Sequence, residues 1–364
     1  MWRTVAVLVL LYLFLVSINL LGKGLKMFGT GFADQLMATT SNPVVGLFVG
    51  ILVTSVIQSS SATTSIIVSL VMGGTLSVQN AVPIVMGANI GTTVTSLLVS
   101  FACVSRREEF RRALGGATVD EFFKAILVAL FLPVELLTGF LRHTSTWLAG
   151  LMAGAEICTF RSPVKSAVEP LVKMIASFIE RSLGPATGAT ILVVVSLALL
   201  LGALFLMVRV LKAASVGRLG VLFDRFIGSG GIRGIVLGLV VTMTVQSSSV
   251  TLSLCVPMAA AGIVTVEQVF AVALGANVGT TVTALLAAFS TGNVNALAIA
   301  LVHTVFNVTG VLLFYPIKPL RRIPIGLARW FAGVGSRSRW IAVLYLVGAF
   351  FVLPLICIFV GRLL

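Results

Sequence analysis

Long apolar segments make up most of the chain, and short polar or basic segments separate them. The apolar segments run near residues 4–21, 81–104, 118–141, 188–208, 267–288, 297–317 and 340–361. Each can cross the hydrocarbon core of a bilayer as a helix, which takes about 20 residues. None shows the alternation of polar and apolar positions that a membrane-spanning barrel requires. The pattern predicts an all-α integral membrane protein.

Four further apolar segments are too short to span a membrane at about 1.5 Å per residue. They run over 44–57 and 62–72 in the first half of the chain and over 235–245 and 250–261 in the second. A polar tetrad, Gln-Ser-Ser-Ser, interrupts each pair at 58–61 and at 246–249. Non-helical backbone at membrane depth must be enclosed by protein or by a wet cavity. We therefore expect two re-entrant helical hairpins, 44–72 and 235–261, whose polar tips meet near the midplane.

The polar positions recur at a fixed distance. The tetrads lie 188 residues apart, and the segment Gly-Ala-Asn-Ile-Gly-Thr-Thr at 87–93 recurs at the same offset at 275–281, with valine for isoleucine. Alignment of 46–100 with 234–288, without a gap, gives 23 identities in 55 positions. The chain is therefore an internal duplication.

The duplication divides the chain into five parts. Repeat 1 covers 25–141, with helices near 81–104 and 118–141, and repeat 2 covers 213–318, with helices near 267–288 and 297–317. Residues 1–22 are expected to form an N-terminal transmembrane helix, and residues 142–212 a linker with one more transmembrane helix. Residues 319–364 are expected to form a basic loop followed by a C-terminal transmembrane helix.

The charged residues predict how the repeats are oriented. Only 10% of residues are charged, against roughly 25% in a soluble domain, so we attribute the net charge of +14 to topology signals rather than to nucleic-acid binding. The segment 105–112 is basic while its counterpart 289–296 has no charge, and this order reverses after the next helix. With basic segments inside, residues 105–112, 209–233 and 318–339 are cytoplasmic and the repeats are inverted. Parallel repeats whose loops diverged are the alternative. The expected location is the cell (inner) membrane, with several spans.

The tetrads and the Gly-Ala-Asn segments offer ligands without a fixed charge. Hydroxyls and the free amides of a restarting helix suit a phosphate-like oxyanion. The predicted anion ligands are Ser59, Ser60, Ser61, Ser247, Ser248 and Ser249. Carboxamide and hydroxyl oxygens suit a sodium ion. The predicted sodium ligands are Gln58, Thr63, Asn89, Thr92, Thr93, Gln246, Thr251, Asn277, Thr280 and Thr281. No Arg or Lys lies in these motifs, so a co-bound cation would have to neutralise a polyanion.

Serine patches in membrane helices also serve interhelical hydrogen bonding. Here two patches recur in register with a second polar motif, which favours a binding site. On the paired Gln-Ser-Ser-Ser and Gly-Ala-Asn motifs, the chain resembles the type II-like sodium/phosphate cotransporter family in its short bacterial form. The resemblance covers both repeats. It implies sodium-coupled symport of inorganic phosphate, with the substrate between the two hairpin tips and without the soluble C-terminal regulatory domain of other bacterial relatives.

A further family pattern follows each Gly-Ala-Asn helix, and the two repeats differ there. Repeat 2 keeps the pattern with His303, Phe306 and Asn307, whereas repeat 1 has Asp120, Glu121 and Lys124. The resemblance implies that Glu121 stands where the family has an aspartate associated with an additional, charge-carrying sodium site, and Glu121 joins the predicted sodium ligands. Asp120 and Lys124 are four residues apart, so an ion pair is available on one helix face. This group lies either inside the membrane or at its interface, and the sequence does not define the sodium stoichiometry.

We expect a secondary transporter that works by alternating access, because no phosphate-loop motif for ATP is present. Sodium-linked efflux or transport of another oxyanion would keep the same fold, and a passive channel would need a continuous charged or carbonyl-lined pore. An enzyme with a serine nucleophile would need a base, yet the chain has only two histidines. We expect no enzymatic activity, no cofactor, no metal other than sodium and no nucleic acid. The expected partners are phosphate, sodium and the lipid bilayer, and the oligomeric state is open.

Overall fold

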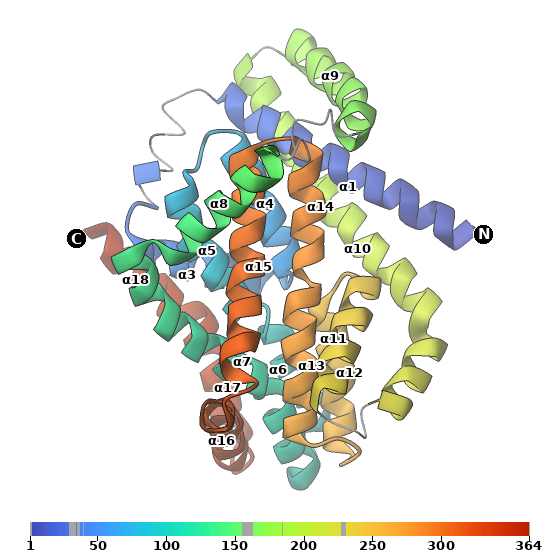
Figure 1. Ribbon diagram of the computed structural model, residues 1–364, viewed down its shortest axis with the longest axis vertical. Helices are drawn as coiled ribbons and strands as arrows, with labels where there is room; N and C mark the ends of the chain where they lie inside the picture. Colours follow the sequence, from blue (N-terminus) through green and yellow to red (C-terminus); the bar gives the residue numbers. More distant parts are fainter. Residues whose placement is uncertain are drawn as a thin grey trace.

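The computed structural model describes residues 2–28, 34, 37–38, 40–154, 163–183, 185–226 and 231–363. All regular elements within these residues are helical (Figure 1). Within the described ranges, six helices are long and apolar enough to cross a membrane, or seven if the bent pair α7 (Arg107–Thr138) and α8 (Phe140–Gly154) counts as one span. The expectation of an all-α, multi-pass membrane protein is confirmed.

Two helical hairpins stand at the expected places. The first consists of α3 (Pro43–Ile57) and α4 (Ser60–Met72), and the second of α11 (Gly231–Val245) and α12 (Ser248–Ala260). Each turn is made by a glutamine in the left-handed region, with φ 58° at both Gln58 and Gln246. Because a non-glycine residue seldom adopts this conformation, the same rare backbone geometry at both tips shows that the duplicated sequence folds in the same way twice.

Each hairpin lies against a broken helix of its own repeat. In repeat 1 the broken helix consists of α5 (Val78–Gly91) and α6 (Val94–Ser100), and in repeat 2 of α13 (Val266–Gly279) and α14 (Thr281–Thr291). A Cβ atom on Gly50 would overlap the carbonyl oxygen of Ile84, and one on Gly87 would overlap that of Leu47. The equivalent glycines of repeat 2, Gly238 and Gly275, face the carbonyl oxygens of Val272 and Ile235 in the same way. Glycines therefore let the backbones of the hairpin and the broken helix touch.

The two repeats point in opposite directions. The end of α4, at Met72, borders a cavity together with Thr291 at the end of α14. The end of α12, at Ala260, packs instead with Cys103, just before the start of α7. Figure 1 shows α4 near the top of the molecule and α12 near the bottom, where α16 (Lys318–Gly335) also lies. The hairpins thus enter the molecule from opposite ends, as inverted repeats require.

The helix predicted at 118–141 is longer at its start and bent near its end. It begins at Arg107, and after Thr138 the chain turns by 73° into α8. Gly139 takes φ 64° at the bend, and the Glu135 carboxylate accepts the backbone N–H of Leu141 at 2.6 Å. Glu135 therefore satisfies an amide at the start of α8 that has no intrahelical acceptor. The position has a structural role in this chain.

The basic segment expected as a loop after residue 318 is a helix. α16 buries Ile325, Ala328 and Phe331 on one face and exposes Arg322 and Arg329 on the other. This amphipathic pattern, with basic residues on the exposed face, is typical of helices that lie in a membrane interface. The C-terminal span follows as α17 (Arg339–Val347), the π-helical turn η3 (Gly348–Val352) and α18 (Leu353–Leu363). The other segment expected as a basic loop, 209–233, belongs to α10 (Pro185–Phe226) and α11 where it is described.

Helices outside the repeats cover one flank of the hairpins. α1 (Trp2–Met27) packs against α10 and α4, and the amphipathic α9 (Pro163–Leu183) packs against α1.

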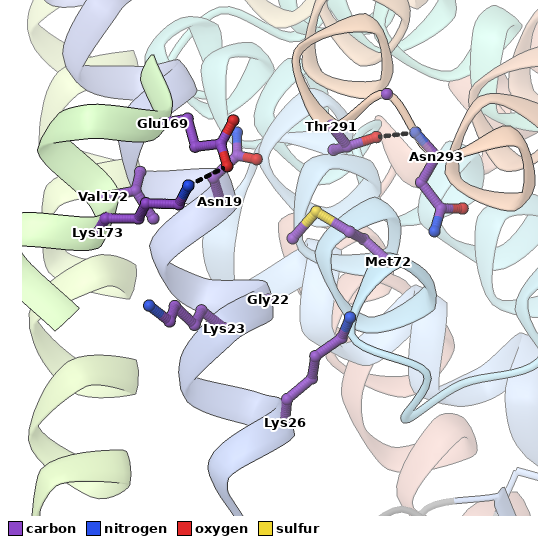
Figure 2. Close-up of a pocket in the computed structure, with 11 residues that line it drawn as sticks. Asn19, Gly22, Lys23, Lys26, Met72, Glu169, Val172, Lys173, Thr291 and Asn293 are labelled. Atoms are coloured by element: carbon purple, nitrogen blue, oxygen red, sulfur yellow. Dashed lines mark hydrogen bonds and ion pairs between the residues drawn. The ribbon is translucent and has the colours of Figure 1, made fainter. Parts of the chain in front are cut away.

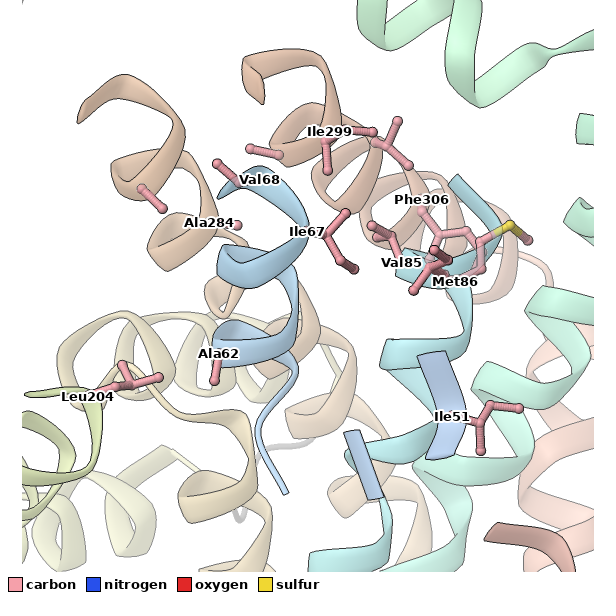
Figure 3. Close-up of a cluster of buried hydrophobic side chains, with 14 of the residues drawn as sticks. Ile51, Ala62, Ile67, Val68, Val85, Met86, Leu204, Ala284, Ile299 and Phe306 are labelled. Carbon is pink, nitrogen blue, oxygen red and sulfur yellow. The ribbon is translucent and has the colours of Figure 1, made fainter. Parts of the chain in front are cut away.

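A cluster of buried apolar side chains lies between the arms of repeat 1 and α15 (Val294–Phe314) (Figure 3). It includes Ile67 and Val68 of α4, Val85 and Met86 of α5, Ala284 of α14, and Ile299 and Phe306 of α15. This cluster fills the space beside α4 beyond its first turn.

Candidate substrate site at the hairpin tips

The first serine of each tetrad caps the helix that follows it. Ser59 Oγ accepts the N–H of Ala62 at 3.2 Å, and Ser247 Oγ accepts that of Val250 at 3.3 Å. The second serines, Ser60 and Ser248, are only 4% and 2% exposed and stand in the first turn of α4 and α12. Amides in a first helical turn lack intrahelical acceptors, and the helix dipole is positive there. Each tip therefore presents buried donors suited to an anion.

The threonine that follows each tetrad ties the two arms of its hairpin together. Thr54 Oγ1 donates to Thr63 Oγ1 at 2.9 Å, and Thr242 and Thr251 form the same contact at 2.8 Å. Thr54 and Thr242 were not among the predicted site residues. They are identical in the alignment of the repeats, and that recurrence is the signal that could have identified them.

One hydrogen bond joins the first tip to the other repeat. Ser61 Oγ lies 2.9 Å from Thr280 Oγ1, at the break between α13 and α14. No equivalent bond between Ser249 and Thr92 occurs in the part of the chain that the structure describes. The structure therefore brings a predicted anion ligand of repeat 1 next to a predicted sodium ligand of repeat 2.

The two glutamines of the tips also differ. Gln246 Oε1 accepts the hydroxyl of Thr283 at 2.5 Å. Gln58 is exposed, and the hydroxyl of Thr95, which corresponds to Thr283, is buried without a partner among the described residues. The same holds for the hydroxyl of Thr64, one turn beyond Ser60. The tip of repeat 1 thus has polar groups that a bound ion could still engage.

The threonines at the helix breaks keep free lone pairs. Thr92, Thr93 and Thr281 donate their hydroxyl hydrogens to carbonyl oxygens of the preceding turn, at 3.2, 2.7 and 2.8 Å. A hydroxyl has one hydrogen to donate and two lone pairs to accept with. Such an orientation leaves the oxygen able to coordinate a cation.

Each asparagine of a broken helix contacts the long helix of the other repeat. Asn89 Oδ1 lies 3.2 Å from His303 Nε2 and accepts the amide of Asn307 at 3.3 Å. Asn277 instead donates its amide to Asp120 Oδ1 at 2.6 Å. We call these groups the neutral cluster (Asn89, His303, Asn307) and the charged cluster (Asn277, Asp120, Lys124). They occupy equivalent positions of the two repeats.

The charged cluster is buried inside the protein and lies within α7 rather than at its end. Lys124 Nζ lies 2.7 Å from Asp120 Oδ2, and both side chains are 2% exposed. Glu121, 3% exposed, accepts the hydroxyl of Tyr345 from α17, while its Oε2 has no partner in the described chain. Sequence reasoning missed Tyr345, because it lies outside the repeats in an apolar helix.

Glu121 faces a different space from the tetrads. It lines a mostly apolar cavity of about 370 Å³ between α3, α7 and the C-terminal span, with Leu47, Tyr345 and Phe350 among the other lining residues. No hydrogen bond or ion pair joins Glu121 to a tetrad residue in the described chain. The predicted sodium ligands thus fall into three groups: those at the tips and helix breaks, the two asparagines of the clusters, and Glu121.

A basic cavity lies at the end of α4 that is far from its tetrad (Figure 2). Its volume is about 370 Å³, and Lys23 and Lys26 of α1 border it together with Met72. Lys173 also borders it, 2.8 Å from Glu169 on α9. Ile67 and Val68, both almost fully buried, lie along α4 between this cavity and Ser61. An apolar layer therefore separates the cavity from the tip.

Two inverted repeats with helix N-termini inside the molecule define the class of multi-pass membrane proteins that includes many secondary transporters. The sequence matches the Na+/Pi-cotransporter family over residues 13–151 and 199–336. These two segments cover both repeats, and the chain belongs to this family.

Sodium-dependent phosphate transport proteins are among the proteins to which this chain is similar. Protein 2B of Homo sapiens is 32% identical over 97% of this chain, and protein 2B of Pongo abelii is 31% identical over 97%. Protein 2A of Ovis aries is 33% identical over 94% of this chain. The aligned region covers 64–65% of these relatives, so the chain spans a little under two thirds of their length. No solved structure matches the chain.

Proposed function

We propose that the protein is a secondary active transporter in the cell (inner) membrane, which carries inorganic phosphate together with sodium by alternating access. Phosphate binds between the two tetrads, and sodium binds to oxygen atoms of the same tips and of the broken helices. The family and the names of the relatives support this proposal. The sodium gradient supplies the energy.

The observation that carries the proposal is the duplicated tip. Two buried helix N-termini with serine hydroxyls enter from opposite ends of the molecule, and Ser61 meets Thr280 across the repeats. A site made by two inverted halves can open to one side or the other when one half moves against its partner. The geometry therefore supports transport better than a fixed pore.

Charge balance explains why sodium belongs in the site. Neither tetrad, nor either Gly-Ala-Asn segment, contains a basic residue. A phosphate ion buried among neutral donors alone would lose its hydration without a countercharge, which costs several kcal/mol or more. Sodium ions on the nearby amide and hydroxyl oxygens supply that countercharge. Phosphate binding and sodium binding are then coupled through their charges.

The test is uptake of radiolabelled phosphate into proteoliposomes that contain the purified protein. We expect uptake to saturate, to run against the phosphate gradient, and to depend on an inward sodium gradient. Sulfate and arsenate as competitors test the choice of oxyanion, and a reversed sodium gradient tests efflux. Uptake that only equilibrates phosphate would indicate a channel, and uptake unaffected by sodium would contradict the coupling.

A further inference from the structure

A buried ion pair distinguishes the charged cluster from the neutral cluster. In both clusters, a residue on a long helix bonds to the asparagine of the other repeat, and a second residue of the cluster lies one turn further along the same helix. On α15 these residues are His303 and Asn307, whereas on α7 they are Asp120 and Lys124. The same framework therefore holds uncharged groups in one half and a cation and an anion in the other.

Asp120 needs a full positive charge beside it. A carboxylate that is removed from water without a countercharge strongly destabilises the folded protein. The amide of Asn277, which donates to Asp120 Oδ1, supplies only a partial charge. The ammonium group of Lys124, 2.7 Å from the other carboxylate oxygen, supplies the rest. A small monovalent cation at the same place would meet the same requirement.

The charged cluster also has the oxygen ligands of a cation site. Asn277 is turned so that its amide faces Asp120, which leaves Asn277 Oδ1 buried without a partner in the described chain. In the neutral cluster the orientation is opposite, and Asn89 Oδ1 is the atom that is satisfied. Carboxylate and amide oxygens are hard ligands of the type that sodium accepts.

We propose that Lys124 is a tethered counter-ion that takes the place of one sodium ion. Its ammonium group neutralises Asp120, so the charged cluster binds one sodium ion fewer than it would with a neutral residue at position 124. This inference rests on the proposed function, because it assumes that the protein works with sodium. It assigns Lys124 a role in setting how many sodium ions accompany phosphate.

The test compares the thermal stability of purified variants in sodium chloride and in N-methyl-D-glucamine chloride at equal ionic strength. Lys124→Asn copies the residue of the neutral cluster and leaves Asp120 without its partner. We expect sodium to raise its melting temperature by about 5 °C or more beyond the effect on the wild-type protein, since a ligand that binds only the folded state stabilises it. The large organic cation cannot enter the cluster and should give no such gain.

Two matched variants show whether the gain comes from Asp120. Lys124→Arg keeps the positive charge, and the double variant Asp120→Asn, Lys124→Asn removes both charges. Neither should gain sodium-dependent stability beyond the wild type. The inference is overturned if Lys124→Asn is equally unstable in both salts, or if it cannot be purified in sodium while the double variant can. It is also overturned if the double variant gains as much from sodium as Lys124→Asn does.

Transport measurements distinguish a failure of this inference from a failure of the proposed function. If wild-type proteoliposomes accumulate phosphate with sodium, Lys124→Asn should show a steeper dependence of uptake on sodium concentration, with a Hill coefficient higher by up to about one unit. An unchanged coefficient would count against the inference. If wild-type proteoliposomes transport no phosphate, the proposed function fails, while the sodium-dependent stability of Lys124→Asn still decides whether the ammonium group replaces a cation.

Discussion

The hairpin tips and the asparagine clusters are both duplicated, yet they have diverged to different degrees. The tips keep the tetrad, the left-handed glutamine, the serine cap and the threonine pair in both repeats. The clusters keep the asparagine but pair it with neutral groups in one half and with an ion pair in the other. In this chain, the parts suited to bind the anion are symmetric, and the parts suited to bind or replace cations are not.

The asymmetry extends into the tips in a weaker form. Gln246 is held by Thr283, whereas Gln58 is exposed and Thr95 lacks a partner in the described chain. Ser61 forms a hydrogen bond to the other repeat, and Ser249 forms none in the described part of the chain. In the proposed alternating-access cycle, any single conformation of the inverted pair is asymmetric, because one end of the molecule is closed when the other is open. Differences in contacts can therefore reverse during a transport cycle, whereas differences in residue type cannot.

The largest expected effect tests the symmetric part. Ser60→Ala and Ser248→Ala each remove one buried hydroxyl from a tip, and we expect each to abolish phosphate uptake or to raise its KM at least about 10-fold, since a hydrogen bond to a charged group contributes about 1.5–3 kcal/mol. Uptake kinetics in proteoliposomes measure this. Ser69→Ala is the matched control for Ser60→Ala, because Ser69 is buried on the same helix and its hydroxyl donates to Ser65 O within that helix. Equal, unchanged kinetics in both tip variants would contradict a site made by two halves.

The next effect tests whether the hairpin and the broken helix pack equally closely in the two repeats. Gly87→Ala and Gly275→Ala place a methyl group against a backbone carbonyl in repeats 1 and 2 respectively. We expect each to lower stability by about 1–3 kcal/mol through overpacking. Gly333→Ala on α16, where a Cβ would meet nothing within 4 Å, should be neutral or slightly stabilising. Melting temperatures compare the three; a neutral result at only one of the two buried glycines would show that the backbone contact is not equivalent.

A smaller effect sharpens the comparison at Glu121, which has no acidic counterpart in repeat 2. If the Glu121 carboxylate supports an additional sodium ion, as the family resemblance implies, Glu121→Gln should reduce the charge moved per phosphate, because the side chain is then neutral. Tyr345→Phe should weaken sodium affinity by a few-fold while leaving the charge per phosphate unchanged, since it removes one hydrogen bond to Glu121. Transport currents recorded together with phosphate flux give both quantities. Identical currents per phosphate in Glu121→Gln would remove Glu121 from the ion path.

The smallest effect concerns the basic cavity at the far end of α4. Changing Lys23 and Lys26 together to Gln should raise the apparent KM for phosphate by roughly 2–3-fold at low ionic strength, because the charges attract the anion from a distance. Salt screens such charges over about 8–10 Å, so the difference should disappear in high salt. The control changes Arg321 and Arg322 of α16 to Gln. These residues lie at the other end of the molecule, so the apparent KM for phosphate added on the side of α8 and α9 should not change. A salt-independent difference would instead indicate a structural effect.

The sequence predicts the architecture well because the duplication is so clear. Identical tetrads in register required identical folding, and the unequal basic segments predicted the inversion that α4 and α12 show. The helical state of the basic segment 318–335 was missed, because a cluster of Lys and Arg between two apolar segments suggests a loop unless the apolar stripe of Ile325, Ala328 and Phe331 is also considered.

The candidate site was predicted by residue type but not by contact. An ion pair between Asp120 and Lys124 was available from their spacing, and the structure confirms it. The contact between Asn277 and Asp120 was not predictable from one sequence, because it joins helices of different repeats and depends on their inverted packing. Tyr345 lies outside the duplication and gives no recurring signal at all.

The glycine contacts have a mechanical consequence. Where α3 touches α5 through Gly50 and Gly87, no side chain lies between the backbones that could change rotamer and let the helices slide. Each hairpin should therefore move with its own broken helix as one rigid body. Motion is then confined to the interface between the repeats. The Ser61–Thr280 hydrogen bond and the two asparagine clusters cross this interface. The hydrogen bonds that respond to bound ions would then also be the contacts that break when one repeat moves against the other.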